Sequence, residues 1–287
     1  VLLPAIEKAG YDDDVSAAVK ATASCMGPVI PPSIPFIIYG VIANVSIAAL
    51  FLGGVIPGCL LCLALMAYMA MIARRRGYPR SPRASLRETA KVTFRTLPAL
   101  LMPVLVIGGI MGGVFTPTEA AGFAVVYAFT VGFFFYRKVR LAMLPGLFLR
   151  AGMETAVVML LIGLSEPFSW VIAVEQIPAK LMAAVTQLAS SPYMFLFLVN
   201  VLLLLIGIPL ETAPAITIMT PVLAPLAAKM GIDPVHFGVI VCFNLVLGLI
   251  TPPVGAVLFS ICGISGLSLE RLSRAIWVPF LVALGVL

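Results

Sequence analysis

Glycines and oxygen-bearing side chains flank two Pro-Pro pairs in a sequence that is otherwise largely apolar. Around Pro31-Pro32 and Pro252-Pro253 the candidate residues are, in chain order, Ser24, Gly27, Ser33, Asn244, Gly248, Thr251 and Gly255. Proline has no backbone N–H, so each pair leaves carbonyl oxygens without partners inside a helix. Such carbonyls coordinate sodium in transporters with discontinuous helices. Two interpretations stay open at both pairs: these groups bind sodium, or Ser and Thr only satisfy the backbone groups freed by proline.

Glu211 and Thr212 interrupt another apolar region, close behind Pro209. An ionisable side chain at membrane depth is costly, and its presence suggests a functional site. Alternatively, Glu211 caps the helix that follows, because negative charge is favoured at a helix N-terminus. We therefore add both residues to the candidate sodium and substrate region, and both interpretations stay open.

The other reactive side chains favour structural roles. Glu119 is predicted to cap the first turn of a helix, and Glu166, beside a proline, is expected to form a hydrogen bond within the scaffold. His236 is the one histidine and has no companion for a metal site, while Cys59 and Cys62 lie in an unbroken apolar run typical of buried small residues. HExxH and GxSxG motifs are absent, so the sequence predicts neither an enzyme nor a resident cofactor.

These candidates belong to a chain whose composition requires a bilayer. Of its 287 residues, 62% are hydrophobic and 10% are charged, against about 45–50% and about 25% in soluble domains. A soluble core of this length cannot bury such an apolar excess. The net charge of +6 fits the excess of Lys and Arg in cytoplasmic loops of membrane proteins, so nucleic acid is not an expected partner.

Apolar segments bounded by basic clusters predict the elements that position the candidates. Roughly 20 apolar residues cross a bilayer, and the expected spans are 46–73, 97–114, 119–136, 152–173 (interrupted at 166–167) and 272–287. Helices along the membrane surface are expected at 85–95, 141–150 and 177–190. Residues 193–208 and 214–228 are too short and too closely joined to be independent spans, so we expect a re-entrant hairpin with its tip at 210–213.

Two segments of the chain align without gaps at an offset of 221 residues. Residues 4–35 match residues 225–256, sharing a Lys-x-Gly-x-Asp pattern that starts at Lys8 and Lys229 as well as the Pro-Pro pair. In each copy we expect a helix to end at the glycine, the aspartate to cap the next helix, and that helix to break at the prolines.

The positive-inside rule gives these two copies opposite orientations. Basic residues at 74–76, 137–140 and 271–274 are expected at cytoplasmic ends. One broken span and one full span separate the first turn from the cluster at 74–76, whereas a single broken span separates the second turn from residue 271. We therefore expect an inverted repeat, a common plan in secondary transporters. The counterpart of the hairpin tip would precede Val1, so an N-terminally truncated chain is expected.

These stretches resemble the large membrane subunit of tripartite ATP-independent periplasmic (TRAP) transporters, the DctM-like family. The matching stretches are GPVIPPSIPFIIYG from Gly27, FLGGVIPG from Phe51, TPTEAA from Thr116, LETAPAITIMTPVLAP from Leu210, GIDPVHFG from Gly231 and TPPVGAVLF from Thr251. The resemblance runs along the whole chain. It departs from the family pattern in the missing N-terminal part, which should hold the Gly-Ser-rich tip of a first hairpin.

The resemblance implies a permease that imports a small organic anion, such as a C4-dicarboxylate, sialic acid or an oxo acid. Sodium ions would drive an elevator motion in a bacterial or archaeal cytoplasmic (inner) membrane. The implied partners are a small DctQ-like membrane subunit, separate or fused, and a periplasmic substrate-binding protein. The alternative is another ion-coupled organic-anion transporter or exchanger that works without a binding protein.

The expected fold is therefore an all-α integral membrane protein with four segments. Residues 1–45 would hold the end of a first hairpin and the first broken helix, and residues 193–266 the second hairpin and second broken helix, together a transport domain. Residues 46–192 would hold scaffold spans, a cytoplasmic basic loop and interfacial arm helices. Residues 267–287 would form a C-terminal span.

Overall fold

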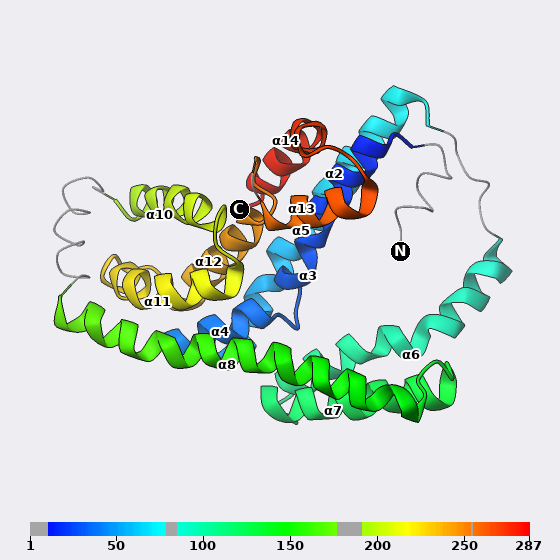
Figure 1. Ribbon diagram of the computed structural model, residues 1–287, viewed down its shortest axis with the longest axis horizontal. Coiled ribbons are helices and arrows are strands. Elements are labelled where there is room, and N and C mark those ends of the chain that lie inside the picture. Colours follow the sequence, from blue (N-terminus) through cyan, green and yellow to red (C-terminus); the bar gives the residue numbers. More distant parts are fainter. Residues whose placement is uncertain (1–10, 79–84, 177–190, 254) are drawn as a thin grey trace. The chain divides into compact units, whose positions relative to one another are not determined.

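The computed structural model describes residues 11–78, 85–176, 191–253 and 255–287, and every regular element in these ranges is helical (Figure 1). In chain order the elements are α2 (Asp13–Ser24), α3 (Met26–Val29), α4 (Ile34–Ala43), α5 (Ile47–Arg76), α6 (Leu86–Met111), α7 (Pro117–Thr130), the π-helix η1 (Val131–Phe135), the 3-10 helix η2 (Leu141–Met143), α8 (Leu144–Val174), α10 (Pro192–Gly207), α11 (Thr212–Lys229), α12 (Pro234–Gly248), α13 (Ala256–Ser265) and α14 (Leu269–Leu284). The prediction of an all-helical protein is confirmed.

The chain divides into two compact units. Unit 1 comprises Val1–Pro79 and Leu161–Leu287, and unit 2 comprises Arg80–Leu160. Helix α5 belongs to unit 1, where it packs against α12 and α14. The compact unit that holds the breaks therefore extends past residue 45, where the sequence placed the start of the scaffold.

Both predicted helix breaks are present, and the helices that lead into them begin at matching positions. Helix α2 begins at Asp13 and α12 begins at Pro234, 221 residues later, as the sequence alignment requires. After the breaks the separation grows by one residue, because α4 begins at Ile34 and α13 at Ala256. The second copy thus has one more residue than the first between its Pro–Pro pair and the next helix, and in both copies the Pro–Pro peptide bond is cis.

The two predicted aspartate caps differ. Asp233 accepts a hydrogen bond from the His236 backbone N–H at 2.9 Å and caps α12, as expected. Asp12 stands at the same position before α2 but makes no side-chain cap. Its carboxylate binds Arg76 and Tyr78 instead, so the prediction that it caps α2 is wrong.

Helix α12 forms the centre of unit 1. Its residues are buried continuously from Phe237 to Gly248, and it packs against α4, α5, α10 and α11. The core beside it is rich in small residues, which include Ala17, Ala18 and Ala21 of α2. Small side chains let helix backbones approach closely, which compensates for the weak drive to bury apolar surface inside lipid.

Helices α10 and α11 form the predicted hairpin. Residues 208–211 join them, and α10 packs along both α11 and α12. Pro192 and Ser191 start α10, with the Ser191 hydroxyl accepting from the Met194 N–H at 3.3 Å. This places the tip, with Glu211 and Thr212, at one end of a packed helix pair, as the sequence predicted.

Two predicted boundaries are wrong. Helix α6 runs without interruption from Leu86 to Met111, so the expected surface helix at 85–95 and the span at 97–114 are one helix. Helix α8 likewise joins residues 144–150 to the expected span and continues through Pro167, where an interruption was predicted. A proline removes one helical hydrogen bond, and in these long apolar helices the bonds of the other turns preserve the helix. The helix predicted at 177–190 lies outside the described residues.

Three described helices are long and apolar enough to cross a membrane: Ile47–Arg76, Leu86–Met111 and Pro117–Phe135. A fourth span is formed if α2, α3 and α4 count together, with a bend of 44° at the first break. The chain is thus a multi-pass membrane protein by helix length and composition.

Candidate functional site

A cavity of about 360 Å³ in unit 1 brings the two breaks and the hairpin tip together. Pro28 and Pro35 reach it from the first break, and Leu249 and Ser260 from the second. Glu211 and Thr212 line it from the hairpin tip. Three segments that lie far apart in the sequence therefore meet at one site.

Three helices begin at the wall of this cavity. The first two residues of each helix line it: Ile34 and Pro35 of α4, Thr212 and Ala213 of α11, and Ala256 and Val257 of α13. The first turn of a helix carries a partial positive charge. The helix termini therefore make this cavity favourable for an anion.

Formal charge at the cavity comes from one carboxylate. Of the described lining residues none is Lys, Arg or His, and Glu211 is the acidic one. Glu211 stands at the N-cap position of α11 but makes no side-chain cap hydrogen bond, and it is exposed. Its position agrees with the capping interpretation, which rests on negative charge at a helix N-terminus. Beside it, the Thr212 hydroxyl is buried and has no hydrogen-bond partner among the described residues.

At the first break the hydroxyl groups satisfy the backbone. Ser33 donates to the Pro28 carbonyl and accepts from the Phe36 N–H at 3.4 Å, so it caps α4. Ser24 donates to the Ala21 carbonyl at 2.6 Å. Gly27 is exposed, and a Cβ built on it would meet no atom within 4 Å. A hydroxyl that donates its proton keeps lone pairs, so both serine oxygens remain capable of binding a cation.

At the second break the hydroxyl group is that of Thr251, which the repeat aligns with Ile30 and not with a serine. It is buried and donates to the Leu247 carbonyl at 3.0 Å. Gly255 allows the backbone to approach Leu249 closely at the break, because a Cβ at this position would collide with the Leu249 carbonyl group. The same carbonyl accepts from the Val257 N–H at 3.1 Å, which holds the start of α13 against the end of α12.

Gly248 has a packing role that the sequence did not reveal. A Cβ on it would lie 2.6 Å from Cα and 2.8 Å from the carbonyl carbon of Gly207. The hairpin helix α10 and the broken helix α12 therefore touch backbone to backbone just before the tip and the break. Gly207 and Gly248 belong to different helices and lie far apart in the sequence, so no local motif predicts this contact.

Asn244 pairs with Asn200, a residue that sequence reasoning missed. The Asn244 side-chain N–H₂ group donates to the Asn200 backbone carbonyl at 3.0 Å and to its side-chain oxygen at 2.6 Å. Asn244 is fully buried, and its own oxygen has no partner among the described residues. A lone Asn in the apolar run of residues 193–208 was the available signal, since polar residues in membrane helices commonly bond across helices.

Of the nine candidate site residues, Glu211 and Thr212 are among the described residues that line the cavity, whereas Ser24, Gly27, Ser33, Asn244, Gly248, Thr251 and Gly255 are not. Three other residues were considered from the sequence. Glu119 forms a capping box with Thr116: its carboxylate accepts from the Thr116 N–H at 2.8 Å, which confirms the predicted cap. His236 lies in the first turn of α12, also as expected. The side chain of Glu166 lies outside the described residues. Among the described residues no three His, Cys, Asp or Glu side chains gather as for a metal ion.

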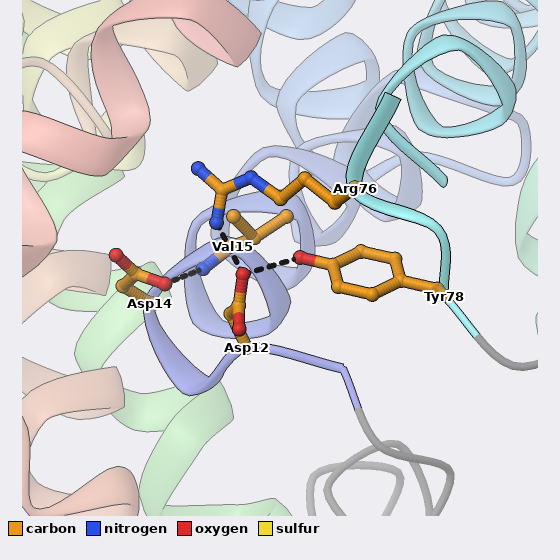
Figure 2. A network of polar contacts seen from close by, with 5 residues as sticks. All are labelled: Asp12, Asp14, Val15, Arg76 and Tyr78. Carbon is orange, nitrogen blue, oxygen red and sulfur yellow. Dashed lines mark hydrogen bonds and ion pairs between the residues drawn. The ribbon is translucent and has the colours of Figure 1, made fainter. Parts of the chain in front are cut away.

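A polar network closes the opposite, basic end of unit 1 (Figure 2). The Asp12 carboxylate accepts from the Arg76 guanidinium and from the Tyr78 hydroxyl, the latter at 2.7 Å. These contacts hold the pKa of Asp12 below its ordinary value, chiefly through the Tyr78 hydroxyl and then through Arg76. The network ties the end of α5 to the start of α2. The sequence prediction, which gave Asp12 the role of a helix cap, did not include these partners.

The comparison with known proteins now extends this geometry. All of residues 1–287 match the family described as "Tripartite ATP-independent periplasmic transporter, DctM component". The sialic acid TRAP transporter large permease protein SiaM of Vibrio cholerae is 39% identical over 282 residues, which is 98% of this chain and 66% of that protein. The C4-dicarboxylate TRAP transporter large permease protein DctM of Pseudomonas aeruginosa is 39% identical over 284 residues, 99% of this chain and 66% of that protein.

A third relative is the isethionate TRAP transporter permease protein DctMQ of Oleidesulfovibrio alaskensis. It is 39% identical over 286 residues, 99% of this chain and 45% of that protein. The chain thus spans slightly less than two thirds of the large permease proteins and less than half of the DctMQ protein. Since the family match covers every residue, the chain belongs to the DctM family, the large membrane component of TRAP transporters.

Proposed function

We propose that this chain forms the core of a permease that imports small organic anions with the help of a binding protein and a sodium gradient. The observation that carries the proposal is the cavity where α4, α11 and α13 all begin. Helix N-termini attract carboxylate groups without a cationic side chain. Sialic acid, C4-dicarboxylate and isethionate, named for the relatives, are all anionic.

Sodium is the proposed coupling ion, with no other cofactor. An anion beside Glu211 needs a compensating cation, because two negative charges in one membrane cavity repel each other. Candidate oxygen ligands are Ser33 and Thr251 at the two breaks, and Asn244 in α12, whose side-chain oxygen is buried without a described partner. Hydroxyl, amide and carbonyl oxygens of broken helices suit sodium.

The proposed mechanism is an elevator motion of an inverted repeat. The Cys25 thiol contacts the Val246 carbonyl at 3.5 Å, and these residues are 221 apart, the offset of the repeat. Contact between equivalent residues is what a two-fold axis between the copies would produce. The pairing of α2 with α14 and of α12 with α5 has the same symmetry. The division into two units supports a moving body, unit 1, and a scaffold that includes unit 2.

The proposed setting is the cytoplasmic (inner) membrane. The proposed partners are a small DctQ-like membrane subunit and a periplasmic substrate-binding protein. The names of the relatives support this, since they are TRAP permeases and one is named DctMQ. In this role the chain transports and does not catalyse a reaction.

Uptake by the full-length protein and its partners in proteoliposomes tests the proposal. We expect anion uptake to require both an inward sodium gradient and the binding protein. Uptake that persists without sodium would refute the coupling. Uptake that needs sodium but not the binding protein would favour the alternative, an exchanger or transporter that works alone.

In the same assay, Thr251→Val tests the binding of sodium separately from the binding of the organic anion. It removes a buried hydroxyl at the second break while keeping the shape of the side chain. We expect the sodium concentration for half-maximal uptake to rise by roughly 5- to 10-fold, the value of one hydrogen-bond-like contact. Thr251→Ser is the matched control and should keep the wild-type value. Equal sodium dependence in both variants would remove this side chain from the site.

A further inference from the structure

The first three turns of α6 carry two parallel stripes of side chains. Leu86, Ala90 and Phe94 form an apolar stripe, and the next residue after each is basic: Arg87, Lys91 and Arg95. Residues four apart lie on one face of a helix, and neighbours are about 100° apart around it. All six side chains are exposed, with Leu86 and Phe94 at 91% and 76%.

Glu88 is the one acidic residue among the described residues 85–95, against three basic ones. Glu88, the acidic residue of this segment, is held at the helix start by Ser85, whose N–H and hydroxyl donate to it at 3.0 and 2.9 Å. A second basic segment follows Tyr136, whose hydroxyl donates to the Arg95 carbonyl at 3.0 Å. That contact brings the basic loop of residues 137–140 beside the stripe.

Because α6 is one continuous helix, its apolar turns determine the depth of the basic stripe in the membrane. The basic turns run directly into the apolar turns up to Met111, which form a candidate membrane span. A basic stripe beside an apolar stripe at the end of a span lies at the level of the lipid headgroups. A nucleic-acid site would account for the basic stripe but not for the exposed apolar stripe beside it.

We propose that α6 binds an anionic phospholipid of the cytoplasmic leaflet. Its phosphate would contact Arg87, Lys91 and Arg95, and its acyl chains would lie against Leu86 and Phe94. This surface is separate from the anion cavity and lies in unit 2. It would anchor unit 2 to one side of the membrane.

Lipid binding to the purified full-length protein tests this proposal. The protein is delipidated in detergent and titrated with phosphatidylglycerol or, for comparison, phosphatidylcholine, and bound lipid is counted by native mass spectrometry. We expect saturable binding of phosphatidylglycerol that the triple variant Arg87→Gln/Lys91→Gln/Arg95→Gln weakens on the order of 100-fold, at about fivefold for each basic residue. Phe94→Ala should weaken it as well.

A relocated-charge variant separates the stripe from net charge. In Arg87→Gln/Thr89→Arg/Lys91→Gln/Thr93→Lys the net charge is unchanged, but two positive charges move to the opposite face of the helix. We expect this variant to lose most phosphatidylglycerol binding while its thermal unfolding matches that of the wild type. Wild-type binding by either charge variant would overturn the proposal. So would equal binding of phosphatidylcholine, or displacement of the lipid by millimolar inorganic phosphate.

Discussion

At the scale of single residues, equivalent positions in the two copies have different surroundings. Gly27 and Gly248 are 221 residues apart, yet Gly27 faces open space and Gly248 touches the backbone of Gly207. The same contrast holds for Asp12 and Asp233, of which only the second caps its helix. Duplicated sequence therefore produces a helix start and a break in both copies, but not the same contacts.

Gly248→Ala is expected to destabilise unit 1. The added Cβ would lie 2.6 Å from a backbone atom of Gly207, which cannot rotate away as a side chain can. Overpacking of this kind costs about 1–3 kcal/mol. Thermal unfolding of the full-length protein in detergent measures the effect.

Gly27→Ala is the matched control for this experiment. A Cβ there meets nothing within 4 Å, so the melting temperature should stay the same or rise slightly. Equal melting temperatures for the two variants would contradict the backbone contact between α10 and α12.

At the scale of elements, two specific contacts add to the packing of the hairpin on the second broken helix, which includes the rings of Phe195 and Phe237. Asn200 and Asn244 form a polar pair between α10 and α12, and Gly207 and Gly248 form the backbone contact nearer the tip. A buried polar pair inside lipid fixes the register of two helices because neither side chain has water as an alternative partner. The hairpin is thus held in one register along α12.

A double-mutant cycle should detect this pair. We expect Asn200→Ala and Asn244→Ala to be non-additive, with a coupling energy of about 0.6 kcal/mol and at most about 1.7 kcal/mol. Part of the Asn200 contact uses its backbone carbonyl, which the substitution retains, so the coupling reports the bond between the side chains. Unfolding of the four proteins in a common detergent measures it. Strict additivity would show that the two amides do not interact.

At the scale of the whole molecule, the chain organises into two units, and a polar network lies where the first one ends. Asp12, Arg76 and Tyr78 tie the end of α5 to the start of α2 (Figure 2), close to the boundary of unit 1 at Pro79. Tyr11 also packs on Tyr78, with ring centroids 4.5 Å apart. The chain passes from unit 1 to unit 2 just after this network, between Pro79 and Arg80, and returns between Leu160 and Leu161.

The Asp12 network should make local order depend on pH. The pKa of Asp12 is lowered in the folded protein. The stabilisation that its carboxylate contributes is therefore present above the unfolded pKa of about 3.9 and is lost as the pH falls through the lower folded pKa. Amide hydrogen exchange at Gly77 and Tyr78, corrected for intrinsic rates, should therefore be faster in Asp12→Asn than in the wild type at pH 7. The two should converge in strong acid.

Asp13→Asn provides the comparison for this measurement. It removes the same charge from the adjacent residue, and we expect exchange at Gly77 and Tyr78 to match the wild type. Equal exchange in Asp12→Asn and the wild type at pH 7 would show that the carboxylate does not hold the end of α5.

Much of the fold could be predicted from local physics. Proline pairs, Lys-x-Gly-x-Asp turns and apolar runs gave the two breaks, the hairpin and its tip, because each depends on a backbone donor or cap that is local in sequence. The predictions for α6 and α8 were wrong because they ended helices where the polarity of the side chains changes, whereas the helical backbone continues through these positions. Polarity decides the depth of a segment in a membrane, whereas hydrogen bonding decides where the helix ends.

By itself, the sequence determined that this protein is a helical membrane protein with a duplicated helix break, and its motifs pointed to the DctM family. Only the tertiary structure decided that both breaks and the hairpin tip line one cavity, that three helix N-termini begin there, and that Asn200 and Gly207 hold the hairpin in place. The physical reason is distance along the chain. Caps and breaks depend on neighbouring residues, whereas a cavity and its electrostatic field depend on segments that packing alone brings together.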